Sequence, residues 1–358
     1  MSETAGTLIG QSNVMTRLRA RVTPGPDPDA SAPLLERLRT RAARGVEGRE
    51  SFIQDAVVLG KRVRLFSNSH HLADFWRDNW WTEHEWRAAT GQVVPREPAL
   101  VVHAIINAAD EPEASYVSIA RQEAFLFNTS YYGDLRATAM EALGRLIGKA
   151  GFVLHAAAVE VNGRGLALVY PKEVIHPTPT WGLLEIQGSS FVADGWVALE
   201  PSGRMHALEK GVYVRTSVLS YYPEYAAKIL FAKFENVPDV SPEQVDARAA
   251  LAEALDASAR RNDPRHSLRG LPPERSRLQL LRLVASPDSR AMVPAEAVFG
   301  KLRIRRATTA AAAFALRAGG EEPVQPAAVE PFPCPGYEVA VGAVPGHPRE
   351  LAKLIAAT

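Results

Sequence analysis

The stretch between residues 151 and 200 constrains the fold more than any other part of the chain. It reads as two apolar strands separated by Asn162-Gly163, a dipeptide typical of two-residue β-hairpin turns. A loop, a helix over 180–187 and a third apolar strand that ends at Asp194 follow. This order is the layout of a phosphate-binding unit, in which backbone amides, a lysine and a carboxylate that holds magnesium surround the phosphates. It predicts an α/β fold with a mixed sheet.

The same stretch resembles HPr kinase/phosphorylase and its relatives, whose fold is shared with phosphoenolpyruvate carboxykinase. The residues that carry the resemblance are LHAAAV at 154–159, NGRG at 162–165, LV at 168–169 and FVADGWVAL at 191–199. The resemblance covers about residues 151–220, and the segments 277–302 and 333–355 look like the C-terminal half of such kinases. It implies an HPr kinase C-terminal-domain-like mixed sheet, with His155 near the active site and Asp194 facing magnesium.

The loop that should bind the phosphates departs from the family pattern. That pattern is Gly-x-x-Gly-x-Gly-Lys-Ser/Thr, whereas residues 171–178 read PKEVIHPT and contain no glycine. Pro177 stands at the lysine position and, like Pro179, has no amide N–H to offer a phosphate. The family's acidic pair is reduced to Asp194, because Gly195 follows it. Ordinary ATP-dependent phosphotransfer is therefore not expected, and the loop is a degenerate one.

Some side chains of this unit remain candidates for chemistry. If the chain is active, we expect His155 and Asp194 to be its catalytic residues, with Asp194 also as a metal ligand. We expect anion contacts in the rewritten loop at Lys172, His176 and Thr178. Each has a structural alternative. His155 can be a core residue whose ring nitrogens are hydrogen-bonded. Asp194 can cap the turn at Gly195, and Lys172 can be a solvated surface residue.

Patterns along the chain divide it into three parts. Residues 1–45 begin with a segment rich in Gly, Pro and polar residues and end in a short basic helix, so we expect an extended or flexible N-terminal arm. Residues 50–150 alternate between strand and helix patterns, which predicts a small α/β domain. Residues 151–358 form the kinase-like core with a C-terminal strand and helix.

Two groups of side chains in the first 100 residues are candidates for binding a partner protein. Trp76 and Trp80 share one face of a helix expected over 70–86, which indicates either core packing or a contact surface. Arg37 and Arg41 lie on the basic face of the arm helix, which suits either solvation or docking onto a partner.

Composition narrows the function classes. The chain has 41 basic and 40 acidic side chains, so its charge gives no reason to expect nucleic acid as a partner. It has no apolar run long enough for a membrane span, and its single cysteine fits a cytoplasmic location. We therefore expect a catalytically degenerate, pseudokinase-like protein that is a binding, regulatory or structural subunit of a protein complex. We expect it to need no cofactor, and a homo-oligomer is a possible form. The alternative is a serine or small-molecule kinase that uses ATP and magnesium through a noncanonical loop.

Overall fold

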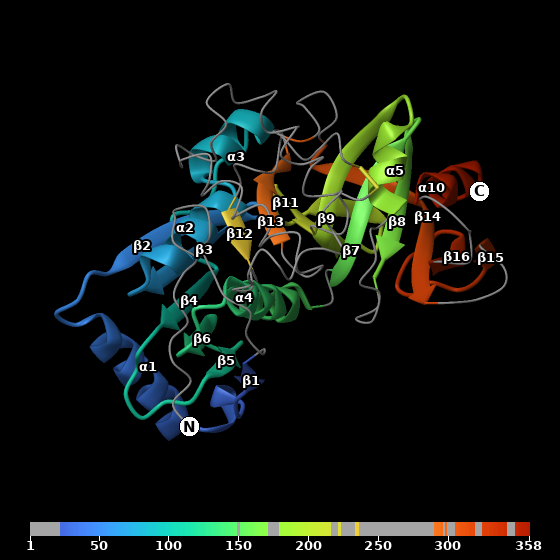
Figure 1. The fold of residues 1–358 in the computed structure, drawn as a ribbon. Coiled ribbons are helices and arrows are strands. Elements are labelled where there is room, and N and C mark those ends of the chain that lie inside the picture. Colours follow the sequence, from blue (N-terminus) through green and yellow to red (C-terminus); the bar gives the residue numbers. More distant parts are fainter. Residues whose placement is uncertain are drawn as a thin grey trace, which may run out of the picture.

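The computed structural model describes residues 22–148, 151–170, 179–215, 221–222, 233–235, 290–295, 298, 305–318, 324–341 and 348–358. Over these residues the chain is a mixed α/β protein with two large mixed sheets, a small antiparallel sheet and six α-helices (Figure 1). The first large sheet uses only residues before 128, and the second uses only residues after 151. The expected α/β class with mixed sheets is thus confirmed.

The first sheet has six strands in the order β1, β5, β6, β4, β3, β2. The strands β2 and β3 form an antiparallel hairpin, as do β5 and β6, while β3, β4 and β6 run parallel to one another. The bounds are β1 Thr23–Pro24, β2 Phe52–Val58, β3 Lys61–Ser67, β4 Leu100–Ile105, β5 Ala114–Ser118 and β6 Glu123–Phe127.

Helices cover both faces of this sheet (Figure 1). Helix α1 (Ala32–Val46) buries Leu38 against one face, and α2 (His70–Asn79) and α4 (Tyr132–Ile147) cover the other. The two-residue strand β1 pairs with β5. Residues 22–46 are therefore packed onto the sheet, which differs from the extended arm that the polar composition predicts, because α1 has an apolar stripe to bury. Residues 1–21 lie outside the described residues.

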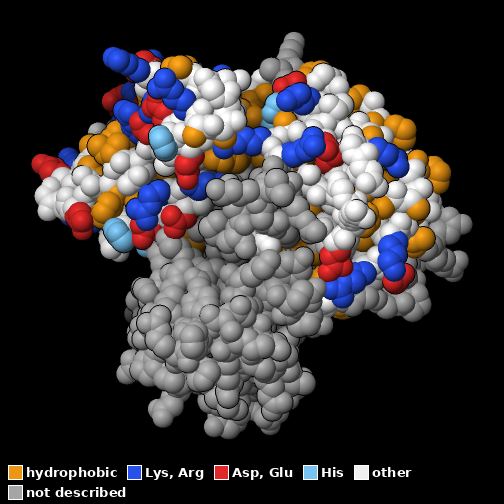
Figure 2. All heavy atoms as spheres, turned by 90° about the horizontal axis from the view of Figure 1, so that it is seen from above, with side chains coloured by type: hydrophobic (Ala, Val, Ile, Leu, Met, Phe, Trp, Pro, Cys, Tyr) orange, Lys and Arg blue, Asp and Glu red, His pale blue; other side chains and the backbone are white. Residues whose placement is uncertain are grey.

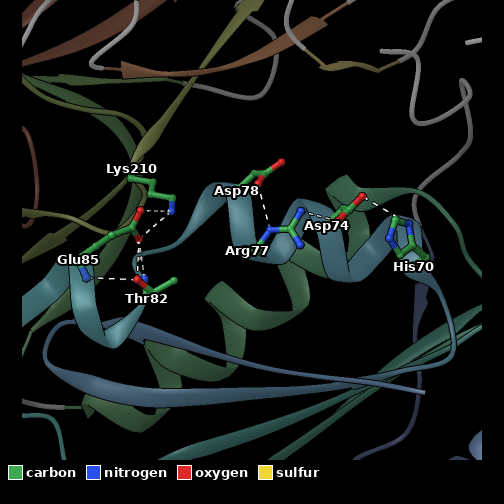
Figure 3. A network of polar contacts seen from close by, with 7 residues as sticks. All are labelled: His70, Asp74, Arg77, Asp78, Thr82, Glu85 and Lys210. Carbon is green, nitrogen blue, oxygen red and sulfur yellow. Dashed lines mark hydrogen bonds and ion pairs between the residues drawn. The ribbon is translucent and has the colours of Figure 1, made fainter. Parts of the chain in front are cut away.

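The single helix expected over 70–86 is wrong. Helix α2 ends at Asn79, and α3 (Glu83–Thr90) begins after a break. The break exists because the Trp81 carbonyl accepts a hydrogen bond from the Val57 amide on the edge of β2, at 2.7 Å. Thr82 then starts the new helix with a capping box: its hydroxyl accepts from the Glu85 amide, and the Glu85 carboxylate accepts from the Thr82 amide. Lys210, from the second half of the chain, binds that same carboxylate (Figure 3).

Removing this cap is expected to destabilise the protein modestly. Thr82→Ala leaves the Glu85 amide in the first turn of α3 without its acceptor, so the free energy of unfolding should fall by about 1 kcal/mol. Chemical denaturation monitored by circular dichroism measures this change. Thr82→Ser keeps the hydroxyl and is the matched control. An equal loss in both variants would show that the methyl group matters and the cap does not.

The second sheet has seven strands in the order β10, β9, β7, β8, β14, β16, β15. β10 also pairs with the first residues of β14, so β7, β8, β14, β10 and β9 form a closed ring. Small apolar side chains such as Ala156, Ala158 and Ala167 fill its core cluster. The bounds are β7 Phe152–Val161, β8 Arg164–Val169, β9 Ser189–Leu199, β10 Arg204–Ala207, β14 Ala307–Ala318, β15 Val324–Pro326 and β16 Gly336–Val341.

The hairpin that opens this sheet forms where the sequence predicts it. Asn162 and Gly163 both have positive φ angles, +50° and +80°, and Val161 pairs with Arg164 across the turn. A type I′ turn needs this conformation at both central positions, which asparagine and glycine tolerate best. Beside the sheet, helix α5 (Pro179–Glu185) packs on α10 (Pro348–Ala357), and α5 also contacts β7 and β9.

A small third sheet lies between the two large ones in the ribbon view (Figure 1). It consists of β11 Gly211–Arg215, β13 Arg290–Pro294 and β12 Lys233–Glu235, in this order. No helix in the described part of the chain is long and apolar enough to cross a membrane.

Candidate functional site

Three rings form a row across the second sheet where β8 ends. His155 on β7 lies between Tyr170, which follows β8, and Trp196 on β9, with 5.6 Å between ring centroids on each side. The Tyr170 amide also donates to the His155 carbonyl, at 3.2 Å. Register explains the row, because His155 pairs with Trp196 and residues directly opposite one another share a face of the sheet.

Asp194 lies on this same face, because it pairs with Ala157 and alternate residues of a strand point the same way. Its carboxylate accepts a hydrogen bond from the Tyr170 hydroxyl at 3.3 Å. That hydroxyl is also 2.8 Å from the hydroxyl of Thr180, which is buried in the first turn of α5. Tyr170 and Thr180 flank the loop of residues 171–178 in the sequence. The Tyr170 hydroxyl therefore links both ends of that loop to the Asp194 carboxylate.

The expectation that a strand ends at Asp194 is wrong, because β9 continues to Leu199. The strand can continue because Gly195 adopts a φ of +124° there. A Cβ at this position would collide with the guanidinium of Arg136, which packs against the glycine. Asp194 is thus an internal strand residue, and capping a turn at Gly195 is not its role.

Behind Gly195 lies a buried ion pair that joins the two halves of the chain, residues 22–148 with the first sheet and residues 151–358 with the second. Arg136 of α4 donates two hydrogen bonds to the carboxylate of Glu209, which also accepts from the Asn79 side chain of α2 at 2.7 Å. The Glu209 side chain is 2% exposed and that of Arg136 is 12% exposed. The Lys210 amide adds a bond to the Asn79 carbonyl. The backbone of β9 at the candidate site is therefore held from its opposite face by a fixed charge pair.

The structure brings together some of the predicted site residues. His155 and Asp194 lie on adjacent strands and share a face, and His155 is exposed, which excludes a core histidine. The anion contacts predicted at Lys172, His176 and Thr178 lie outside the described residues. In the part of the chain that the structure describes, no group of three or more His, Cys, Asp and Glu side chains could hold a metal ion.

The two tryptophans predicted as a contact surface belong to the core instead. Trp76 and Trp80 are each 1% exposed, and their rings contact each other with 4.4 Å between centroids. They pack between α2, α4 and the first sheet, together with Tyr132. Large aromatic side chains on one helical face stabilise a core most strongly when they are fully buried. Of the two alternatives for Trp76 and Trp80, core packing is therefore the one that the structure has.

The two arginines predicted to dock a partner are engaged within the chain. Arg37 and Arg41 of α1 both reach Glu111, at 3.3 and 3.9 Å, and Arg41 also pairs with Asp110. These contacts tie α1 to the loop before β5. Arg37 remains half exposed, so its binding to a partner stays a prediction.

Sequence reasoning missed three residues of the site: Tyr170, Thr180 and Trp196. The only signal for Tyr170 is that a tyrosine ends an otherwise apolar strand, and the only signal for Trp196 is its place two residues after Asp194. The chain matches no protein-family model and no curated protein.

Proposed function

We propose that the chain is a catalytically degenerate relative of HPr kinase/phosphorylase that acts as a binding, regulatory or structural subunit of a protein complex. The observation that carries this proposal is the position of the Tyr170 hydroxyl between Thr180 and Asp194. Phosphoryl transfer uses the corresponding carboxylate to hold magnesium beside the phosphates. Here a hydroxyl of the chain itself binds that carboxylate, at the base of a loop without glycine.

The residues present do not fit magnesium and ATP well. The Asp194 carboxylate already accepts a hydrogen bond from Tyr170, and among the described residues no group of three or more His, Cys, Asp and Glu side chains could hold a metal ion. Magnesium is usually bound through one or two carboxylates together with the substrate phosphates, and those phosphates need cations and amide donors of their own. Pro177 and Pro179 remove an expected cation and two amide donors.

A second candidate function is a kinase with a noncanonical phosphate loop. The observation that favours it is the exposed His155, which shares a face of the sheet with Asp194. An accessible imidazole near a carboxylate suits general acid-base chemistry on a hydroxyl substrate. His155 would then act on the substrate hydroxyl, and Asp194 would hold the metal.

Nucleotide binding separates the two functions. We expect the melting temperature of the full chain to stay unchanged with millimolar ATP or GTP and magnesium, because the loop lacks its phosphate contacts. A ligand present at 100 times its dissociation constant would add about 2.7 kcal/mol of stability. A shift that Asp194→Ala abolishes would overturn the proposal and support the kinase.

A restored loop provides the positive control for this measurement. The variant Pro171→Gly, Val174→Gly, His176→Gly, Pro177→Lys recreates the family pattern, since Thr178 already supplies the hydroxyl. Combined with Tyr170→Phe, which frees the Asp194 carboxylate from its hydroxyl partner, it is expected to gain a thermal shift with magnesium and ATP. Failure to gain one while the fold remains intact would count against the family resemblance itself.

A further inference from the structure

A cavity of about 460 Å³ lies between the two large sheets, far along β9 from Asp194. The hairpin between β2 and β3, helix α3 and the end of α4 supply one wall, and β7, β9, β10 and β14 supply the other. Pockets for small organic ligands typically measure about 300 to 1,000 Å³ and lie between structural units. The size and place of this cavity therefore fit a small molecule.

The polar part of the cavity is cationic. Its permanent charges are those of Lys61, Arg204 and Arg306, against one carboxylate, Glu200. That carboxylate is hydrogen-bonded to His206 at 2.7 Å, and this bond holds the pKa of Glu200 below its usual range. Glu200 therefore stays ionised with a partner of its own, and the remaining positive charges favour an anion.

Arg306 is held in a fixed orientation at this site. Its guanidinium lies over the rings of Trp81 and Trp86, 4.9 and 5.2 Å from their centroids, and donates to the Glu85 carbonyl. Stacking between a guanidinium and aromatic rings holds the guanidinium in a defined plane, so the positive charge of Arg306 has a fixed position in the cavity wall. An arginine fixed in this way suits a planar acid group such as a carboxylate, or a phosphate.

The rest of the lining is apolar. Trp86, Ile147, Phe152 and Leu199 contribute to the cavity, and Phe152 is 47% exposed although it begins a strand of the closed ring. Seen from above, basic side chains gather where the two parts of the described surface meet, with hydrophobic side chains beside them (Figure 2). An apolar wall beside fixed cations recognises a ligand that has both kinds of surface.

We infer that this cavity binds a small organic anion with an aromatic or other apolar body and one acid group, either a carboxylate or a phosphate. The inference is independent of the proposed function, because the cavity lining includes none of the residues grouped around His155 and Asp194. A ligand bound here would contact both halves of the chain at once. Binding would therefore stabilise the two halves against separation, which suits a regulatory subunit.

Calorimetric titration of the full chain with three probes tests the inference. The probes are 2-naphthoate, 2-naphthyl phosphate and the neutral 2-naphthalenemethanol, which share one ring system and differ in the acid group. Either anion is expected to bind at least about tenfold more tightly than the alcohol, a difference of about 1.4 kcal/mol. The ratio between the two anions then identifies the acid group that the site prefers.

Variants place the binding in the cavity. Arg204→Gln and Lys61→Gln each remove an exposed cation from the lining, and Arg204→Gln is expected to weaken the preferred anion about tenfold. Arg44→Gln removes an equally exposed cation from α1 and is the matched control. Gln92→Trp fills the mouth of the cavity and should weaken all three probes. Equal affinity for anion and alcohol, no binding at about 1 mM, or equal effects of Arg204→Gln and Arg44→Gln would each overturn the inference.

Discussion

Replacing Arg136 by alanine is expected to lower the free energy of unfolding by about 3 to 5 kcal/mol, because it leaves the buried Glu209 carboxylate without its counter-charge. The size of the effect follows from burial, since the Glu209 side chain is only 2% exposed and the Asn79 amide cannot neutralise it. The pair also joins α4 to the chain after β10. Urea denaturation of the full chain measures the change, together with any separation of its transition into two steps.

The same helix provides a control for this prediction. Arg145 of α4 pairs with Glu141 one turn away, but both side chains are 42–50% exposed. Exposed pairs of this spacing contribute about 0.3 to 0.5 kcal/mol, so Arg145→Ala should cost little. If Arg136→Ala were no more destabilising than Arg145→Ala, the buried pair would not be what holds the two halves together.

Acid is expected to destabilise the protein through His103, by roughly 3 kcal/mol between pH 7 and 4. Its ring is stacked between Phe66 and Phe125, with centroids 5.5 and 5.0 Å away, and burial lowers the pKa of this histidine from 6.5 to about 4. The folded protein thus keeps the ring neutral while the unfolded chain binds a proton below pH 6.5. The stability that His103 contributes is complete above pH 6.5 and is lost as the pH falls towards 4.

Two variants isolate this effect from the titration of carboxyl groups. His103→Phe keeps an aromatic ring between the two phenylalanines, and His103→Gln keeps a polar group, but neither can bind the proton. The free energy of unfolding of each variant is measured by urea titration from pH 7 to 4. It should fall less steeply with pH than that of the native protein, and the reduction should be the same in both variants. A native slope in both variants would show that His103 is not the group responsible.

Local signals in the sequence predict a large part of the fold. The Asn162-Gly163 turn and the apolar strands on either side of it depend on neighbours within a few residues, and both form as expected. The break at Trp81 also had a local signal, the Thr-x-x-Glu pattern at Thr82–Glu85. The aromatic stripe across 76–86 hides that signal, because its spacing suits a continuous helix.

Other features depend on residues that meet only in the folded chain. The alanine-rich segment 307–318 becomes β14 between β8 and β16, although alanine favours helices, and its Ala313 is fully buried in the core cluster of the closed ring. The Tyr170 bridge needs α5 and β9 to come together, and the pairing of Arg136 with Glu209 needs both halves of the chain. The cavity has walls from both halves, so no single motif indicates it.

The closed ring of strands also sets the order in which the chain can fold as it leaves the ribosome. All strands of the first sheet have emerged once Phe127 is out, and its strand pairings are mostly between near neighbours in sequence. The ring must wait for β14, because Gly165 pairs with Ala310 and β10 pairs with residues 307–309. Contacts between such distant residues form slowly. In the nascent chain β8 therefore cannot pair with β14 until residues 307–318 have been made, and an unpaired strand edge favours misassembly.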